Sequence, residues 1–389
     1  MYLKSLCHDF INAVTKMYAK DRVSLHEPIF VGKEKELLNQ AIESSFVSYQ
    51  GKQVTDFETE LGSFTGSKFA VSTVNGTAAL HLGLVAAGVK PDHEVITQAL
   101  TFVATANAIS YCGASPIFLD IDNDTLGLSP EALLNFLKTN AQYKNGSTYN
   151  KLTGRKISCV VPMHTFGIPS KIIEIRKICD KFDLKLIEDS AEALGSYYEN
   201  KHLGRFGEMG IFSFNANKII TTGGGGMIVT ENMKTFEHLL HISKTSKTSH
   251  EYEFFHDSIG YNYRMPNINA CLGLAQIEQL PKYLKIKREL FRYWSEFFLE
   301  YDLTTKGPSS NSISNHWIIP VKFPKPEDRT VFLKDTNKRK IGTRPMWTLM
   351  SKLPMYKSCY NDGLANSKYA ENHFVCIPSG VPSTKINSG

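Results

Sequence analysis

The 389-residue sequence has no long apolar run, no paired cysteines and no block of basic residues. Without a long apolar run, no segment is predicted to span a bilayer. The seven cysteines are scattered and include no Cys-x-x-Cys pair, which favours free thiols in a reducing compartment over disulfides or a zinc site. The net charge of +6 is spread along the chain, whereas nucleic-acid-binding proteins concentrate their Lys and Arg. We therefore expect no metal site, no nucleic-acid partner and no membrane insertion.

The amino-terminal residues predict an amphipathic helix. Met1 to Ser5 contain neither the apolar region nor the cleavage site of a signal peptide, so we expect a cytoplasmic protein. Over residues 1–20, apolar residues recur near helical spacing, and the polar face is not strongly basic. This pattern favours a helix that packs on the body of the protein or on a partner subunit over one that lies on a membrane.

Strand and helix patterns alternate through the middle of the chain. Strands are predicted at 69–74, 94–97, 115–120, 158–161 and 185–187, and helices at 77–87, 102–112, from Ser129 onward, and at 171–182. Ser129-Pro130 is typical of a helix start, with Ser as the cap and Pro in the first turn. This alternation predicts an α/β fold with a mostly parallel sheet, which binds ligands at the carboxyl ends of its strands. The polar segment 139–157 is predicted to be a surface loop.

The pattern changes after about residue 249. Two long helices are predicted at 266–280 and 283–301, and strands at 317–323 and 373–377. These elements suit a smaller carboxy-terminal α+β domain. We therefore predict an amino-terminal helix (1–22), a large α/β domain (23–250) and a small domain (251–389), with no internal repeat.

One lysine and one acid follow apolar runs at predicted strand ends. Asp189 follows Leu186 and Ile187, and Lys218 follows the run around Phe214 and precedes four glycines. Pyridoxal phosphate needs a lysine for a covalent link, a carboxylate against its pyridine nitrogen and a cradle for its phosphate. Taken singly, the two motifs are more simply a strand end with solvated acids and a surface lysine; taken together, they predict Lys218 and Asp189 as the catalytic pair.

Phosphate ligands are predicted near three turns. The hydroxyls of Ser213, Thr221 and Thr222 lie beside the lysine in the sequence. Gly76 and Thr77 follow a strand and open a helix, where backbone N–H groups and the helix dipole bind anions. A plain turn with a Thr cap is the alternative. The sequence has no Gly-x-Gly-x-x-Gly motif, which disfavours a nicotinamide enzyme.

These motifs resemble the DegT/DnrJ/EryC1/StrS family of sugar-nucleotide aminotransferases over residues 24–378. The blocks that carry the resemblance are Asn75-Gly76-Thr77-Ala78-Ala79, 98–105, Glu188-Asp189-Ser190-Ala191-Glu192, 212–218, 223–226, Gly260-Tyr261-Asn262-Tyr263-Arg264-Met265 and Gly342-Thr343-Arg344-Pro345. Several blocks are most similar to the branch that makes UDP-4-amino-4,6-dideoxy-N-acetylglucosamine, on the bacillosamine and legionaminic acid routes. The resemblance implies the fold of the type I pyridoxal phosphate enzymes.

The resemblance also implies roles for single residues. Phe102 would stack on the pyridine ring, although an aromatic residue at a helix start is more often part of a core. Glu192, where the wider family has Gln or His, would lie near the phenolic oxygen of the cofactor. Asn262 would contact the phosphate bound in the neighbouring subunit, which implies a homodimer with shared active sites; without the resemblance it is a polar turn residue.

His316 and Arg344 are candidate contacts for the sugar nucleotide, since Arg suits a diphosphate, and His164, at a predicted strand end on the active-site side, is a candidate contact for cofactor or sugar. Surface or structural hydrogen bonds are the alternatives. The implied reaction moves an amino group from L-glutamate, through pyridoxamine phosphate, to the C4 ketone of a UDP-linked 4-keto-6-deoxy-N-acetylhexosamine in a glycan or lipopolysaccharide pathway. The alternatives are a dTDP- or GDP-linked keto sugar aminated at C3 or C4, and a regulatory or binding protein that has lost the reaction. Relatives that dehydrate sugars carry His where this chain has Lys218.

Overall fold

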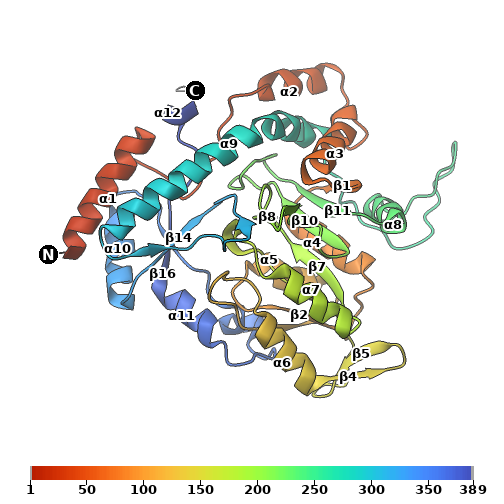
Figure 1. Cartoon of the computed structure of the whole chain (residues 1–389). Coiled ribbons are helices and arrows are strands. Elements are labelled where there is room, and N and C mark those ends of the chain that lie inside the picture. Colours follow the sequence, from red (N-terminus) through yellow and green to blue (C-terminus); the bar gives the residue numbers. More distant parts are fainter. Residues whose placement is uncertain (1, 387–389) are drawn as a thin grey trace.

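The computed structural model describes residues 2–386 and contains a seven-stranded sheet between layers of helices (Figure 1). The strand order is β1 (Phe69–Thr73), β11 (Gly226–Thr230), β10 (Met209–Ser213), β7 (Lys185–Asp189), β6 (Ile157–Val161), β2 (Glu94–Gln98) and β3 (Ser115–Leu119). β11 runs antiparallel to both of its neighbours, and the strands from β10 to β3 are parallel. The predicted mostly parallel α/β sheet is therefore confirmed.

Side chains of alternate strand residues enter different apolar cores. In β2, Val95 packs with α4 (Gly76–Ala86), α5 (Val103–Tyr111) and α8 (Met233–Ser243), whereas Ile96 packs with α6 (Pro130–Asn140) and α7 (Ile172–Lys181). A third core joins β10 and β11 to α3 (Lys52–Thr65) and to the long helix α9 (Asn267–Leu299). Because both faces of the sheet are covered, its strands are apolar nearly throughout, as parallel strands usually are.

A four-stranded antiparallel sheet forms the centre of the carboxy-terminal part. Its order is β12 (Thr304–Thr305), β14 (Ile319–Lys322), β16 (Phe374–Ile377) and β15 (Arg344–Pro345). It packs on α1 (Tyr2–Tyr18), α10 (Pro326–Lys338) and the end of α9, where the Phe10 ring lies 5.1 Å from that of Trp294 and 5.0 Å from that of Phe332. The predicted amino-terminal helix therefore packs on its own chain. The domain boundaries at residues 22 and 250 stay a prediction.

Two sequence-based expectations were wrong. The segment 139–157 contains a hairpin, β4 (Ala141–Lys144) and β5 (Ser147–Asn150), because Asn145 and Gly146 adopt the left-handed conformation (φ 51° and 71°) that a two-residue hairpin turn requires. The two long helices predicted around residue 281 are the single helix α9, with Pro281 inside it. Pro281 removes one N–H donor, but the packing of α9 against α2 (Glu34–Glu43) and α3 keeps the helix continuous.

The remaining elements are short. They are the strands β8 (Tyr197–Tyr198), β9 (Lys201–His202) and β13 (Ser312–Ile313), the helices α11 (Ala365–His373) and α12 (Ser383–Ile386), and 3-10 turns at Thr165–Gly167, Met350–Lys352 and Pro354–Tyr356. Within residues 2–386, no helix has both the length and the apolar character needed to cross a membrane.

Candidate active site

A cavity of about 550 Å³ lies at the carboxyl edge of the large sheet. β7 ends there at Asp189, β10 ends there at Ser213, and α4 begins there after β1. The small domain closes the cavity with residues around Trp317 and Trp347. Eight of the residues proposed from the sequence line it: Gly76, Thr77, Phe102, Asp189, Glu192, Ser213, Lys218 and Arg344.

Lys218 lies between a carboxylate and an aromatic ring. Its Nζ is 3.1 Å from Glu192 Oε1 and 4.0 Å from the centre of the Trp317 ring, and its side chain is only 12% exposed. Trp317 also donates its indole N–H to the carbonyl oxygen of Asn217, at 2.6 Å, which attaches the ring to the lysine loop. The amine is therefore held at a defined place on the cavity wall.

Glu192 is a buried acid with two fixed contacts. One carboxylate oxygen faces Lys218, and the other accepts the backbone N–H of Phe166 at 2.8 Å. Burial raises the pKa of Glu192 to about 7, against the opposing effects of Lys218 and the Phe166 N–H. The carboxyl group can therefore take up or release a proton at neutral pH beside the lysine amine.

The raised pKa of Glu192 predicts a pH dependence of stability in the cofactor-free protein. A carboxyl group with a raised pKa in the folded state stabilises the protein fully below its ordinary pKa of 4.5, and this stabilisation is lost as the pH rises through about 7. The wild-type thermal midpoint should therefore fall relative to that of Glu192→Gln between pH 5 and pH 8. Thermal unfolding of both proteins across this range checks it, and a constant difference would contradict the assignment.

Asp189 lies at the end of β7 and is almost fully buried. Its Oδ2 accepts the Thr105 hydroxyl at 2.6 Å, and its Oδ1 accepts the Ala191 N–H at 3.2 Å. Burial raises the pKa of Asp189, and the Thr105 hydrogen bond and the charge of Lys218 oppose the increase. A buried, oriented carboxylate of this kind suits the protonated nitrogen of a pyridine ring.

The opposite end of the cavity is built to receive an anion. Gly76 and Thr77 form the first turn of α4, capped by the Asn75 side chain, which accepts the Ala78 N–H at 2.7 Å. A Cβ atom on Gly76 would lie 2.8 Å from the Ser213 Cβ, so only glycine allows β10 to approach α4 so closely. The free N–H groups of a helix start and the Ser213 hydroxyl together suit a phosphate. Lysine, acid and phosphate cradle thus share one cavity, and these residues fit pyridoxal phosphate.

Aromatic side chains form the rest of the wall. Phe102 is 48% exposed, and its ring lies edge-on to Trp347 at 6.1 Å. Trp347 in turn lies 4.9 Å from the ring of Phe166. Sequence reasoning missed Thr105, Phe166, Trp317 and Trp347. Thr105 lies in the first turn of α5, three residues after the Phe102 cap, within the block 98–105 that the sequence analysis singled out.

The structure does not bring the two proposed histidines to the cavity. His164 is fully buried, with Nε2 3.1 Å from Glu188 Oε2 and Nδ1 accepting the Ser170 N–H at 3.2 Å. His316 stacks on Phe291 at 4.0 Å, and burial lowers its pKa to about 3. Both have structural contacts, and neither lines the cavity.

Three further residues also lie away from the cavity lining. Thr221 donates its hydroxyl to the Phe214 carbonyl at 3.2 Å, and Thr222 is buried. Asn262 is exposed and pairs with Lys244. The two threonines are therefore not positioned as phosphate ligands, whereas the role of Asn262 needs a second subunit and stays a prediction.

Comparison with known proteins identifies the chain. The model of the DegT/DnrJ/EryC1/StrS aminotransferase family matches residues 29–385. The chain belongs to this family. The aminotransferase is 34% identical over 338 residues to GDP-perosamine synthase of Escherichia coli O157:H7, which covers 87% of this chain and 88% of that protein. It is 33% identical over 376 residues to EpsN of Bacillus subtilis strain 168, a protein named for pyridoxal phosphate-dependent aminotransfer, covering 95% and 93% of the two chains.

Solved structures agree with this assignment. Helicobacter pylori PseC, an aminotransferase involved in the biosynthesis of pseudoaminic acid, superposes with a TM-score of 0.83 at 25% identity and covers 92% of this chain and 93% of PseC. The family and the type I fold expected from the motifs are therefore confirmed, and the protein is a pyridoxal phosphate-dependent aminotransferase.

Proposed function

We propose that this aminotransferase moves the amino group of L-glutamate to the C4 ketone of UDP-2-acetamido-2,6-dideoxy-4-keto-hexose, giving UDP-4-amino-4,6-dideoxy-N-acetylglucosamine. The observation that carries the proposal is the convergence of Lys218, Glu192 and Asp189 with the start of α4 on one cavity. The names of the relatives, a GDP-perosamine synthase and an enzyme of pseudoaminic acid biosynthesis, support a nucleotide-linked keto sugar as the substrate class.

The residues of the cavity have complementary tasks. When bound, pyridoxal phosphate supplies an electron sink and carries the amino group. Lys218 Nζ would hold the cofactor at its aldehyde carbon, with loss of water, and its freed amine would carry the proton during transfer. Glu192 exchanges a proton with that nitrogen across 3.1 Å. Asp189 would keep a proton on the pyridine nitrogen, and Gly76, Thr77 and Ser213 would hold the phosphate.

The part of the cavity wall that remains for the substrate is apolar, and the cation Arg344 lies at its exposed rim. Phe166, Trp317, Met346 and Trp347 offer apolar surface, which suits the methyl group of a 6-deoxy sugar. Arg344 is exposed and uses one guanidinium nitrogen, Nη1, for the Asn337 side chain and the Thr343 carbonyl, both at 2.7 Å. Its other N–H donors form no hydrogen bond within residues 2–386. Such free guanidinium donors suit a diphosphate.

A GDP-linked 4-keto-6-deoxy sugar is the second candidate, since two relatives, from Escherichia coli and Vibrio cholerae, are named GDP-perosamine synthase. The purified enzyme should be incubated with L-glutamate and the UDP-, GDP- and dTDP-linked keto sugars, while 2-oxoglutarate and the amino sugar are measured by mass spectrometry. We expect kcat/KM for the UDP sugar to exceed the others by about tenfold or more, which corresponds to about 1.4 kcal/mol of differential binding. A preference for the GDP sugar would replace the proposed substrate, and amination of none of them would reject the substrate class.

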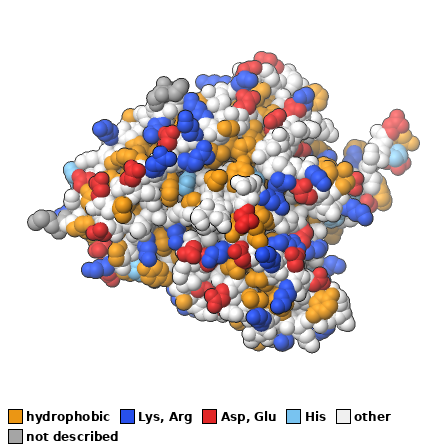
Figure 2. Space-filling view, viewed as in Figure 1, with side chains coloured by type: hydrophobic (Ala, Val, Ile, Leu, Met, Phe, Trp, Pro, Cys, Tyr) orange, Lys and Arg blue, Asp and Glu red, His pale blue; other side chains and the backbone are white. Residues whose placement is uncertain are grey.

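A projecting arm supports the proposal of a homodimer with shared sites. Residues 247–259 leave the body beyond α8 as a paired loop, with Lys247 opposite His256 (Figure 1; Figure 2, right). Tyr252, Phe254 and Ile259 on this arm are 75%, 81% and 86% exposed. Exposed apolar side chains in such a cluster mark a contact surface, and Asn262 follows at the base of the arm.

Light scattering on the purified protein tests the homodimer. It should give twice the chain mass of 43.6 kDa, and the mass of a monomer would contradict shared sites.

A further inference from the structure

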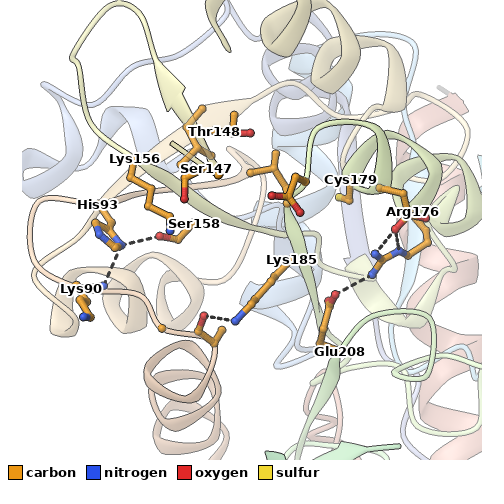
Figure 3. Close-up of a pocket in the computed structure, with 17 residues that line it drawn as sticks. Lys90, His93, Ser147, Thr148, Lys156, Ser158, Arg176, Cys179, Lys185 and Glu208 are labelled. Carbon is orange, nitrogen blue, oxygen red and sulfur yellow. Dashed lines mark hydrogen bonds and ion pairs between the residues drawn. The ribbon is translucent and has the colours of Figure 1, made fainter. Parts of the chain in front are cut away.

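A second and larger cavity, of about 710 Å³, lies at the edge of the sheet opposite the active site (Figure 3). Its lining includes His93 just before β2, Ile157 at the start of β6 and Lys185 at the start of β7. Because these strands are parallel, their amino ends meet at the edge away from Asp189 and Ser213. The cavity is therefore separate from the site of amino transfer.

Basic side chains line this cavity in excess of the acids. Arg176 is paired with two acids, since it donates to Asp180 at 2.8 Å and to Glu208 at 3.1 Å. In the described chain, no ion pair is formed by the three remaining cations, Lys90, Lys156 and Lys185, or by the one remaining acid, Asp183. Lys185 donates to the carbonyl oxygen of Ala87 at 2.7 Å. Together the four cations of the lining (Lys90, Lys156, Arg176 and Lys185) and its three acids (Asp180, Asp183 and Glu208) leave a net charge of about +1.

His93 adds a neutral donor to this group. Its Nδ1 accepts the Lys90 backbone N–H at 3.2 Å and lies 2.6 Å from the Ser158 hydroxyl (Figure 3). Because Nδ1 accepts that N–H, the neutral ring carries its proton on Nε2 as a donor. Burial, with the charges of Lys156 and Lys90, lowers the pKa of His93. The neutral ring therefore offers its Nε2–H as a donor beside the lysines.

The β4–β5 hairpin builds one side of the cavity. Its turn contributes Gly146, Ser147 and Thr148 to the lining, and the Thr148 hydroxyl donates to the carbonyl oxygen of Phe182 at the end of α7, at 2.5 Å. This hydrogen bond fixes the hairpin beside α7. The cations therefore line a recess bounded by the hairpin and α7, with Lys90 and Lys185 at its exposed rim.

We propose that this cavity is a second ligand site that binds a small phosphate-bearing anion. Its lysines, the Ser147 hydroxyl and the imidazole N–H are donors that phosphate oxygens accept, and its volume accommodates a group as large as a pyrophosphate or a nucleotide. The proposal does not depend on the sugar substrate, because no residue of this cavity takes part in amino transfer.

The test uses the enzyme loaded with pyridoxal phosphate, titrated calorimetrically with inorganic phosphate, pyrophosphate and UDP. Lys90→Ala/Lys156→Ala should weaken pyrophosphate binding at this site by at least about tenfold, since charge-assisted hydrogen bonds are lost. Lys144→Ala is the matched control, because Lys144 lies on the same hairpin but stacks on Tyr149, outside the lining. The same titration of Arg344→Ala measures how much of the diphosphate binding comes from the active site, so that this part can be subtracted.

The titrations distinguish a specific anion site from binding to diffuse surface charge. Loss of one class of binding sites in the double variant, with Lys144→Ala within twofold of wild type and amino transfer unchanged, supports the site. The tightest of the three ligands then identifies whether free phosphate, pyrophosphate or a nucleotide is its occupant. Unchanged binding in the double variant, or equal weakening by Lys144→Ala, overturns the proposal, the latter because the effect would then come from diffuse surface charge.

Discussion

Replacement of Lys218 by Ala should lower the rate of amino transfer by roughly 10³- to 10⁴-fold, in the upper part of the range that a positioned acid–base group supplies. The amine is the one basic nitrogen placed against Glu192 on the cavity wall in the described chain, 3.1 Å from its carboxylate. Its removal eliminates both the covalent link and the proton carrier. The measurement is the initial rate of 2-oxoglutarate formation with saturating glutamate and keto sugar.

Lys218→Arg is the matched control for charge. The guanidinium keeps a cation near Glu192 and Trp317 but does not form the link or release a proton at working pH. It should therefore be as inactive as Lys218→Ala, while both variants keep the far-ultraviolet circular dichroism of the wild type. Turnover near that of the wild type in either variant would rule out the assigned role.

Asp189→Asn should lower the rate by about 10²- to 10³-fold, the usual effect of removing one preorganised electrostatic group. Asn has the same shape as Asp but lacks the charge that keeps the pyridine nitrogen protonated. Asp189 is buried, and its two oxygens are fixed by Thr105 and Ala191. Steady-state kinetics and the absorption spectrum of the loaded variant measure the loss.

Thr105→Val is the control for Asp189. It removes the hydroxyl that orients Asp189 Oδ2 at 2.6 Å but leaves the charge. We expect a loss well below that of Asp189→Asn. If the two variants lose the same activity, orientation and not charge is what Asp189 contributes.

The sequence predicted the parallel strands of the large sheet, because these strands end in turn or polar residues, but it did not predict the antiparallel strand β11 or the helix α8. Ser129 caps α6 through the Ala132 N–H at 3.2 Å, as its position before Pro130 indicated. The cofactor end of the cavity followed from the same logic, since Gly76, Asp189, Ser213 and Lys218 all stand where strands leave the sheet. The local sequence pattern shows where each strand ends, and parallel strands bring these ends together at one edge of the sheet.

The substrate end could not be predicted in this way. Trp317 and Trp347 come from the small domain, about a hundred residues beyond Lys218, and only tertiary packing brings them to it. His164 and His316 illustrate the reverse error, because polar residues close to a site in the sequence turned into the core to satisfy Glu188 and to stack on Phe291. Burial decides such cases, and a single sequence does not show which way a side chain turns.

The central claim concerns which amine binds the cofactor, and chemical trapping tests it most directly. The enzyme loaded with pyridoxal phosphate is reduced with borohydride, digested and mapped by mass spectrometry. The reduced cofactor should be found on the peptide that contains Lys218, and on no peptide of the Lys218→Arg variant. Recovery of the label on another lysine, with Lys218 unmodified, would contradict the account.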